Sequence, residues 1–173
     1  QGFSIQLSQY YGAKDFENLR KSLAHSYRLT AFIAAGVLIL SQSFASLVLT
    51  GLHTPSNIIG MSLLYLRIIF CGIPATAAYN MFASALRAMG NSKTPLTAMI
   101  IASVLNVSLD ILFVAGFGWG VAGAAIATVI AQSFSAVYCF LILRRIDIVH
   151  LTRADFMPAS GMNARLMKLG IPV

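Results

Sequence analysis

The sequence predicts an all-α integral membrane protein. Hydrophobic residues make up 58% of the chain and charged residues only 10%, whereas a soluble domain carries about 25% charged residues. A soluble core could not bury this much apolar surface, but lipid can surround it. The apolar residues fall into four runs of about 20 residues or more, the length that a helix needs to cross a bilayer core of about 30 Å. The sequence lacks the alternating patterns of about ten residues that barrel strands need, so helices are expected.

Four complete membrane helices are expected, each bounded by turn residues. Their approximate ranges are 29–49, 58–86, 95–117 and 121–143, within a membrane region of 23–143. Residues 1–22 are expected to form the end of a preceding helix and a cytoplasmic loop, and residues 144–173 a cytoplasmic linker and the start of the next helix. Because the chain begins without Met and ends where a new apolar segment begins, we expect a fragment of a longer protein.

The basic residues predict the orientation of the helices. Eleven of the twelve Lys and Arg residues lie before the first helix, between the second and third, or after the fourth. The connections at 50–57 and 115–120 contain neither residue. Positive charge accumulates on the cytoplasmic side, so these two connections are expected outside and the basic segments inside the cell. The net charge of +7 is therefore a topology signal, and no nucleic-acid partner is expected.

Asp110 is the single acidic residue inside a membrane run, where a charge costs about 2.5–3.5 kcal/mol on insertion scales. Ser103 and Asn106 precede it at spacings that place all three residues on one helical face. Their carboxylate, amide and hydroxyl oxygens suit a hard cation such as Na⁺, or a proton held on the carboxylate. The alternative is structural, with a protonated Asp110 bonded to a neighbouring helix.

The fourth run carries a polar pair, Thr128 and Gln132, one helical turn apart. The short turn before this run makes the third and fourth helices antiparallel neighbours, and counting from the turn places Thr128 near the level of Asp110. These residues either belong to the same site or form hydrogen bonds between helices. Gly120, Ala124 and Thr128 repeat a small residue every four positions, which predicts a close-packed helix face.

The second run is interrupted by Arg67 and Pro74. Pro74 frees a backbone carbonyl and permits a bend, and Asn80 follows six residues later. A kink beside polar side chains suits a transport cavity, and a kinked structural helix is the alternative. Arg67 is expected either to reach outward to the membrane interface or to pair with an acidic residue elsewhere in the protein.

The sequence contains no motif for nucleotide binding or hydrolysis, such as GxxxxGK[ST], HExxH or GxSxG. Cys71 and Cys139 lie in separate apolar runs, and the three histidines are far apart. These patterns predict neither a disulfide framework nor a transition-metal site.

Six short segments, taken in order, resemble the multidrug and toxic compound extrusion (MATE) family of the flippase-like transporter superfamily. They are QYYGA at 9–13, YLRI at 65–68 with GIP at 72–74, LRAMGNSKTP at 86–95, LNVSLD at 105–110, GWGVAGAAIAT at 118–128 and LGIP at 169–172. The resemblance covers essentially the whole chain. It implies a twelve-helix transporter with two six-helix lobes, of which this chain would be most of the amino-terminal lobe, followed by the inter-lobe linker.

The resemblance also implies a function. Members of the family are secondary active transporters, not enzymes, and export cationic or amphipathic small molecules in exchange for Na⁺ or H⁺. It therefore implies a multi-pass protein of a bacterial inner membrane, with no cofactor beyond the coupling ion. The expected partners are a small organic substrate, often cationic, the membrane lipid and the missing helices of the same chain.

The family's cation site includes an Asn-x-x-x-Asp pair on the fifth helix and a threonine on the sixth, which Asn106, Asp110 and Thr128 match. An asparagine on the fourth helix also belongs to it, and Asn80 is the nearest candidate. The resemblance thus implies that any bound metal ion is a Na⁺ at this site. An acidic residue on the first helix completes the family's site and is absent from this chain. Residues expected to line the cavity or act as a gate are Pro74, Ser103, Gln132 and Arg67.

Two other readings remain open from the sequence. A lipid-linked oligosaccharide flippase would share the helices but needs a strongly cationic cavity, for which the chain offers only Arg67. A noncatalytic membrane subunit or receptor would give no reason for the stripe that contains Asn106 and Asp110, and would tolerate apolar replacements there.

Overall fold

The computed structural model describes residues 2–146, with no side-chain description for the first two of these, and every element in this range is a helix. The predictions made above for the segment after residue 146 lie outside the described residues. The elements are α1 Gly2–Gly12, α2 Phe16–Gly51, α3 Ile59–Cys71, α4 Ile73–Ala88, α5 Lys93–Asp110, the π-helix η1 Ile111–Gly116 and α6 Gly120–Arg144.

The prediction of four membrane-spanning segments is confirmed. Four helical stretches are long and apolar enough to cross a bilayer. They are Phe16–Gly51, Ile59–Ala88, Lys93–Gly116 and Gly120–Arg144, so α3 with α4, and α5 with η1, each form one span.

The first membrane helix begins earlier than expected, at Phe16 instead of about residue 29. Asp15 caps its N-terminus by accepting hydrogen bonds from the Asn18 backbone N–H at 3.2 Å and the Asn18 side-chain amide at 2.7 Å. One turn further, Lys21 pairs with Glu17 at 2.6 Å. A cap and an i, i+4 ion pair stabilise a polar helix start. The 36 residues of α2 span about 54 Å at 1.5 Å per residue, so α2 extends beyond the hydrocarbon core.

The second membrane span is broken at Gly72, which separates α3 from α4. Pro74 lies in the first turn of α4, where a missing backbone N–H costs little because that group has no partner within the helix. The break therefore falls two residues before the proline that predicted it.

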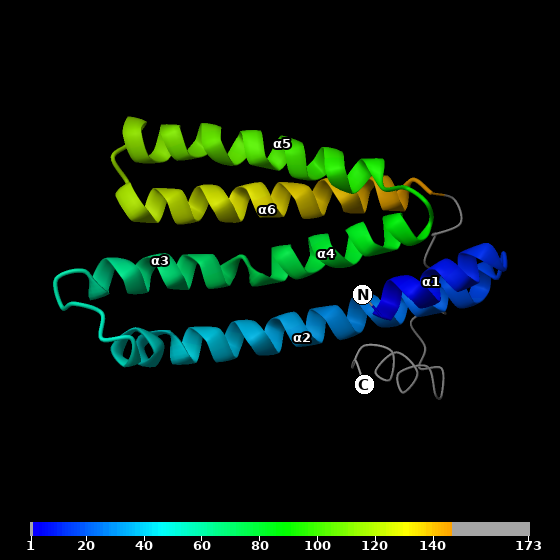
Figure 1. The fold of residues 1–173 in the computed structure, drawn as a ribbon, viewed down its shortest axis with the longest axis horizontal. Helices are drawn as coiled ribbons and strands as arrows, with labels where there is room; N and C mark the ends of the chain where they lie inside the picture. The colour runs from blue at the N-terminus through cyan, green and yellow to red at the C-terminus, as the bar shows by residue number, and fades with distance from the viewer. Residues whose placement is uncertain (1, 147–173) are drawn as a thin grey trace.

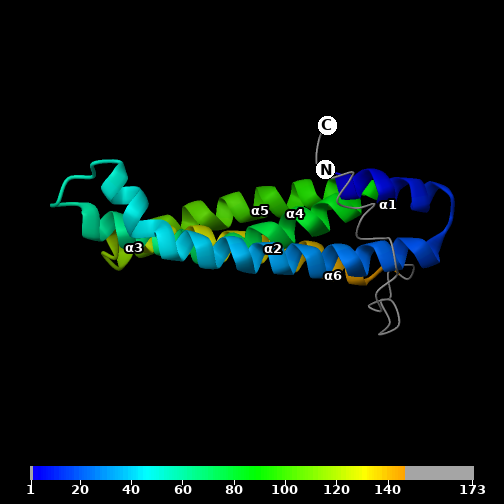
Figure 2. The ribbon, with the colours of Figure 1, turned by 90° about the horizontal axis from the view of Figure 1, so that it is seen from below.

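The helices lie side by side along one long axis, as Figure 1 shows. The turn between α1 and α2, the connection between α4 and α5, and the C-terminal end of α6 share one end of the bundle, at the right of Figures 1 and 2. Loop 52–58 and turn 117–119 lie at the opposite end. The basic residues of the described connections therefore gather at one end, as the predicted topology requires.

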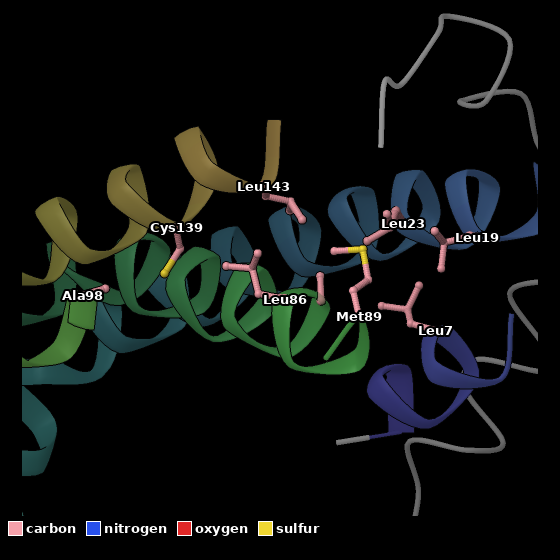
Figure 3. Packing of buried hydrophobic residues seen from close by; sticks show 9 residues of the cluster. Leu7, Leu19, Leu23, Leu86, Met89, Ala98, Cys139 and Leu143 are labelled. Atoms are coloured by element: carbon pink, nitrogen blue, oxygen red, sulfur yellow. The ribbon is translucent and has the colours of Figure 1, made fainter. Parts of the chain in front are cut away.

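A cluster of buried hydrophobic residues lies at this basic end and joins five helices (Figure 3). Its members are Leu7 from α1, Leu19 and Leu23 from α2, Ala85, Leu86 and Met89 at the end of α4, Ala98 from α5, and Cys139 and Leu143 from α6. The cluster fixes α1 against the longer helices, and the cavities described below lie beside it or closer to the middle of the bundle.

The packing face predicted for α6 is wrong at Gly120. Gly120 is exposed and has a φ of +54°, so it serves the turn that starts α6. No atom of another residue lies within 4 Å of the position that a Cβ would take at Gly120. The close contact lies at Gly123 instead, where a Cβ would be 3.0 Å from the Cβ of Phe113. The buried small residues that follow at the same spacing are Ala127 and Ala131.

Candidate functional site

A cavity of about 370 Å³ lies between α4, α5 and α6. It is lined by Thr76, Tyr79 and Asn80 of α4, Met99, Ala102, Ser103 and Asn106 of α5, and Thr128, Ala131, Gln132 and Ser135 of α6. Asn106 is 13 residues from the start of the span Lys93–Gly116 and 10 from its end, so the cavity is near mid-membrane. Most of the lining side chains carry a polar group, and none is formally charged.

The structure brings Asn106 and Thr128 together, as the sequence predicts. The Asn106 side-chain amide donates to the Thr128 hydroxyl at 3.3 Å, and that hydroxyl donates to the Ala124 carbonyl at 3.0 Å. Thr128 can therefore only accept from Asn106. The amide nitrogen of Asn106 is used in this contact, so its carbonyl oxygen, which has no partner among residues 2–146, is available to a ligand.

A second hydrogen bond crosses the cavity wall between α4 and α6. The Thr76 hydroxyl donates to the Gln132 side-chain carbonyl at 2.7 Å. The amide nitrogen of Gln132 then remains as a donor at the cavity. Sequence reasoning predicted Gln132 but missed Thr76, although Thr76 lies one turn before Asn80 and therefore shares its helical face.

Ser103, which was expected at the cavity, and Asn80, which was expected at the cation site, both line this cavity. The Asn80 side chain is exposed and makes no hydrogen bond to any group in the described part of the chain. Tyr79 and Ser135 were missed. The Tyr79 hydroxyl donates to the Pro95 carbonyl at 3.2 Å and Ser135 donates to the Ala131 carbonyl at 3.2 Å, so both are largely satisfied within the protein.

Asp110 is the last residue of α5 and directly precedes the π-helix η1. It is half-buried and does not line the cavity. The expectation that Thr128 lies at the level of Asp110 is wrong, because Thr128 bonds to Asn106, one turn before Asp110. One carboxylate oxygen, Oδ1, is buried and has no hydrogen-bond partner among the described residues. An unsatisfied buried acceptor costs about 1–3 kcal/mol, and single π-helical turns occur frequently at functional sites. Asp110 therefore offers a carboxyl group one turn from the neutral side chains of Asn106 and Thr128.

Pro74 and Arg67 do not line the polar cavity. Pro74 lines a separate, almost wholly apolar cavity of about 430 Å³ between α2 and α4. Arg67 is exposed on α3, and its backbone carbonyl accepts a hydrogen bond from the Gln42 side chain at 2.9 Å. Gln42 also donates to the sulfur of Cys71 at 3.3 Å, so it fastens the end of α3 to α2.

The donor set at the site fits a monovalent hard cation. Residues 2–146 contain no group of three or more His, Cys, Asp or Glu side chains that could hold a metal ion together. Asn106 and Thr128 offer neutral oxygens, and Asp110 offers one carboxylate. Hard cations prefer such oxygen ligands, and a single carboxylate also suits a proton.

Comparisons with known proteins identify the family. The family model described as MatE matches residues 1–112. Over 166 residues the chain is 33% identical to the "Probable multidrug resistance protein YpnP" of Bacillus subtilis (strain 168), with 96% of this chain and 37% of that protein covered. It is 34% identical over 179 residues to the "Probable multidrug resistance protein YoeA" of the same strain, with 99% and 39% covered.

A solved structure supports the same fold. It is the inward-facing conformation of a multidrug resistance MATE family transporter of the MOP superfamily, with a TM-score of 0.90 and 24% identity. The match covers 98% of this chain and 39% of that one, so the chain spans less than two-fifths of its relatives. The chain is part of a multi-pass membrane protein, and because the MatE model matches 112 of its 173 residues, it belongs to the MatE family of transporters.

Proposed function

We propose that this chain forms the ion-binding part of an antiporter that exports cationic or amphipathic small molecules in exchange for Na⁺ or H⁺. The observation that carries the proposal is the position of Asp110, whose buried Oδ1 lacks a partner one helical turn from the hydrogen-bonded pair of Asn106 and Thr128. The names of the relatives support the substrate class, since two are described as multidrug resistance proteins. The remaining helices of the same protein would complete the export pathway.

In this proposal, the charge and the neutral ligands have different roles. The Asp110 carboxylate supplies the charge that attracts a cation or takes up a proton. Asn106 and Thr128 supply neutral oxygens that replace part of the hydration shell of Na⁺. A proton and a sodium ion would compete for the same carboxylate oxygens, so one site serves either coupling ion.

Ion binding drives export only if the two states of the transporter bind the ion differently. A ligand shifts a conformational equilibrium by its differential affinity for the two states. Asn106 and Asp110 lie on α5 and Thr128 on α6, so relative movement of these helices would change the ligand distances. An ion bound in one arrangement would thus bias the inward–outward equilibrium.

The test is efflux from proteoliposomes that contain the full-length protein, under an imposed Na⁺ or H⁺ gradient. Asp110→Asn keeps the size of the side chain but removes both its charge and its titrating proton. We expect it to abolish ion-driven export while the protein remains inserted and folded. Asp15→Asn is the matched control, because it makes the same substitution at a helix cap, where Asn serves as well as Asp. Export by Asp110→Asn at the unmutated rate under both gradients would show that Asp110 is structural.

A further inference from the structure

Asn80 lies between two cavities. It lines the polar cavity that contains Asn106 and Thr128, and it also lines a second cavity of about 190 Å³ between α1, α2 and α4. The second cavity is otherwise lined by Leu7, Leu23, Ser26, Thr30, Ala77, Met81 and Ser84. Leu7 and Leu23 belong to the buried cluster at the basic end of the bundle (Figure 3), so this cavity lies on the cytoplasmic side of the first.

Polar side chains continue from the second cavity towards the basic end. Ser22, Ser26 and Thr30 are spaced four residues apart on α2 and therefore share one face. Ser22 and His25 are almost fully buried, as is Gln6 of α1. Each has a buried polar atom with no hydrogen-bond partner among the described residues: Ser22 Oγ, His25 Nε2 and Gln6 Oε1.

Ser22, His25 and Gln6 do not line the second cavity itself, whose own polar lining residues are Ser26, Thr30, Asn80 and Ser84. Water in the cavity can hydrogen-bond to these four side chains. A polar group removed from water without a partner costs several kcal/mol in the least favourable surroundings, and buried waters satisfy such groups where a polar cavity has room. A cavity of 190 Å³ has room for several waters, since each occupies about 30 Å³ in the liquid. Ser26 donates to the Ser22 carbonyl within α2 at 2.8 Å, whereas the Asn80 side chain has no hydrogen-bond partner in the described part of the chain.

We propose that the second cavity is a water-filled vestibule through which the coupling cation, sodium or hydronium, leaves the ion site for the cytoplasm, and that Asn80 forms the partition between the two. This inference rests on the proposed antiport function. Asn80 lines both cavities, so its amide oxygen can bind the cation after the cation leaves Asn106.

The apolar cavity between α2 and α4, which shares Thr30 and Met81 with the second cavity, provides a comparison within the protein. It is lined by Tyr27, Thr30, Ala31, Ala34, Ala35, Leu38, Pro74, Ala78, Met81 and Phe82. Although it is larger, about 430 Å³, an apolar cavity of this kind stays dry. Ala77 lines the polar vestibule and its neighbour Ala78 the apolar cavity. These two residues are therefore matched in type, depth and helix.

The first experiment compares Ala77→Cys with Ala78→Cys in the full-length protein, with all native cysteines replaced. Inside-out membrane vesicles are treated with a small, positively charged methanethiosulfonate reagent. The thiolate is the reactive form and needs water to stabilise its charge, so Ala77→Cys should react about tenfold faster than Ala78→Cys, or more. Equal rates, or no reaction at either position, would overturn the vestibule.

The second experiment asks whether the ion uses the vestibule. Modification of Ala77→Cys should reduce export severalfold under the gradient that drives it, Na⁺ or H⁺, and the same treatment should leave Ala78→Cys unchanged. Asn80→Leu should also reduce export severalfold, Asn80→Ser should restore most of it, and neither should alter labelling of Ala77→Cys from the cytoplasm. Full export after complete modification of Ala77→Cys would overturn the ion path. The labelling rates do not depend on transport, whereas the antiport proposal is tested by export with Asp110→Asn. Failure of the vestibule proposal can therefore be told apart from failure of the antiport proposal.

Discussion

The Asn106 amide and the Thr128 hydroxyl lie 3.3 Å apart and form the hydrogen bond that joins α5 to α6 at mid-membrane. The Thr128 hydroxyl donates its own proton to the Ala124 carbonyl at 3.0 Å. This second bond determines the direction of the first, because Thr128 has no proton left to give to Asn106. The side-chain carbonyl oxygen of Asn106 therefore points away from Thr128 and remains as a hydrogen-bond acceptor with a fixed orientation.

This geometry predicts that the hydroxyl matters more than the size of the side chain. Thr128→Val keeps the shape but removes the acceptor, which leaves the Asn106 amide free to rotate. We expect a weaker apparent affinity for the driving ion, and Thr128→Ser should retain most of it. In a double-mutant cycle with Asn106→Ala, thermal unfolding should give a coupling energy of about 0.6 kcal/mol and no more than about 1.7. Additive effects of the two substitutions would show that the contact contributes nothing.

The helix cap at Asp15 predicts a dependence on pH. Hydrogen bonds from the Asn18 side chain and backbone hold the pKa of this carboxyl below its usual value. A group whose pKa is lowered on folding stabilises the protein above its unfolded pKa of about 4 and loses this effect as the pH falls through the folded pKa. As the pH is lowered from 5, the thermal midpoint of the unmutated protein should therefore fall more than the thermal midpoint of Asp15→Asn. Parallel midpoints across this range would contradict the prediction.

The topology is tested with two matched Ser→Cys substitutions. Ser56 lies in the loop at the end without Lys or Arg, and Ser92 lies beside Lys93 in the connection between α4 and α5, and both are exposed. In intact cells and a cysteine-free background, an impermeant reagent added outside should label Ser56→Cys but not Ser92→Cys. Opening the cells should expose Ser92→Cys. Labelling of Ser92→Cys from outside would reverse the orientation.

The number of membrane spans, and the approximate bounds of the second, third and fourth, were predictable from the sequence, because lipid imposes a minimum apolar length on each. The short turn correctly made the two helices antiparallel neighbours, but counting residues from it placed Thr128 level with Asp110, whereas Thr128 bonds to Asn106, one turn earlier. The packing face of α6 was not predictable. This helix is apolar all round and has small residues at several adjacent positions, so neither periodicity nor spacing distinguishes Gly120 from Gly123 as the contact.

Thr76 illustrates a second limit of the sequence. The hydroxyl of a threonine in a membrane helix can donate to the backbone carbonyl one turn earlier. The Thr76 hydroxyl lies 3.2 Å from the Gly72 carbonyl oxygen in this way. Only the three-dimensional arrangement reveals its shorter contact of 2.7 Å with Gln132 on α6. The start of α2 was missed because the loss of apolar residues before residue 29 does not end a helix whose N-terminus Asp15 caps.

At Gly72, the break between α3 and α4 is flanked by hydrogen bonds that involve two glutamines. Gln42 bonds to the end of α3 on one side, and Gln132 bonds to Thr76 in the first turn of α4 on the other. A Cβ on Gly72 would lie 3.0 Å from Gln132 Oε1, 3.0 Å from the Ile69 carbonyl oxygen and 3.1 Å from Val129 Cγ2.

Gly72→Ala must therefore displace Gln132 or separate α4 from α6. Overpacking costs about 1–3 kcal/mol, and the gain from replacing a helical glycine is only about 0.5–1 kcal/mol, so the net effect is destabilising by roughly 1–2 kcal/mol. The control is Gly60→Ala on α3, where no atom lies within 4 Å of the new Cβ and the substitution should be neutral or stabilising. The measurement is the thermal midpoint of the full-length protein in detergent. Because Gln132 lines the polar cavity, Gly72→Ala should also lower ion-driven export more than Gly60→Ala does. Equal midpoints for the two variants would mean that α6 moves aside at no cost and that the break is not held at Gly72.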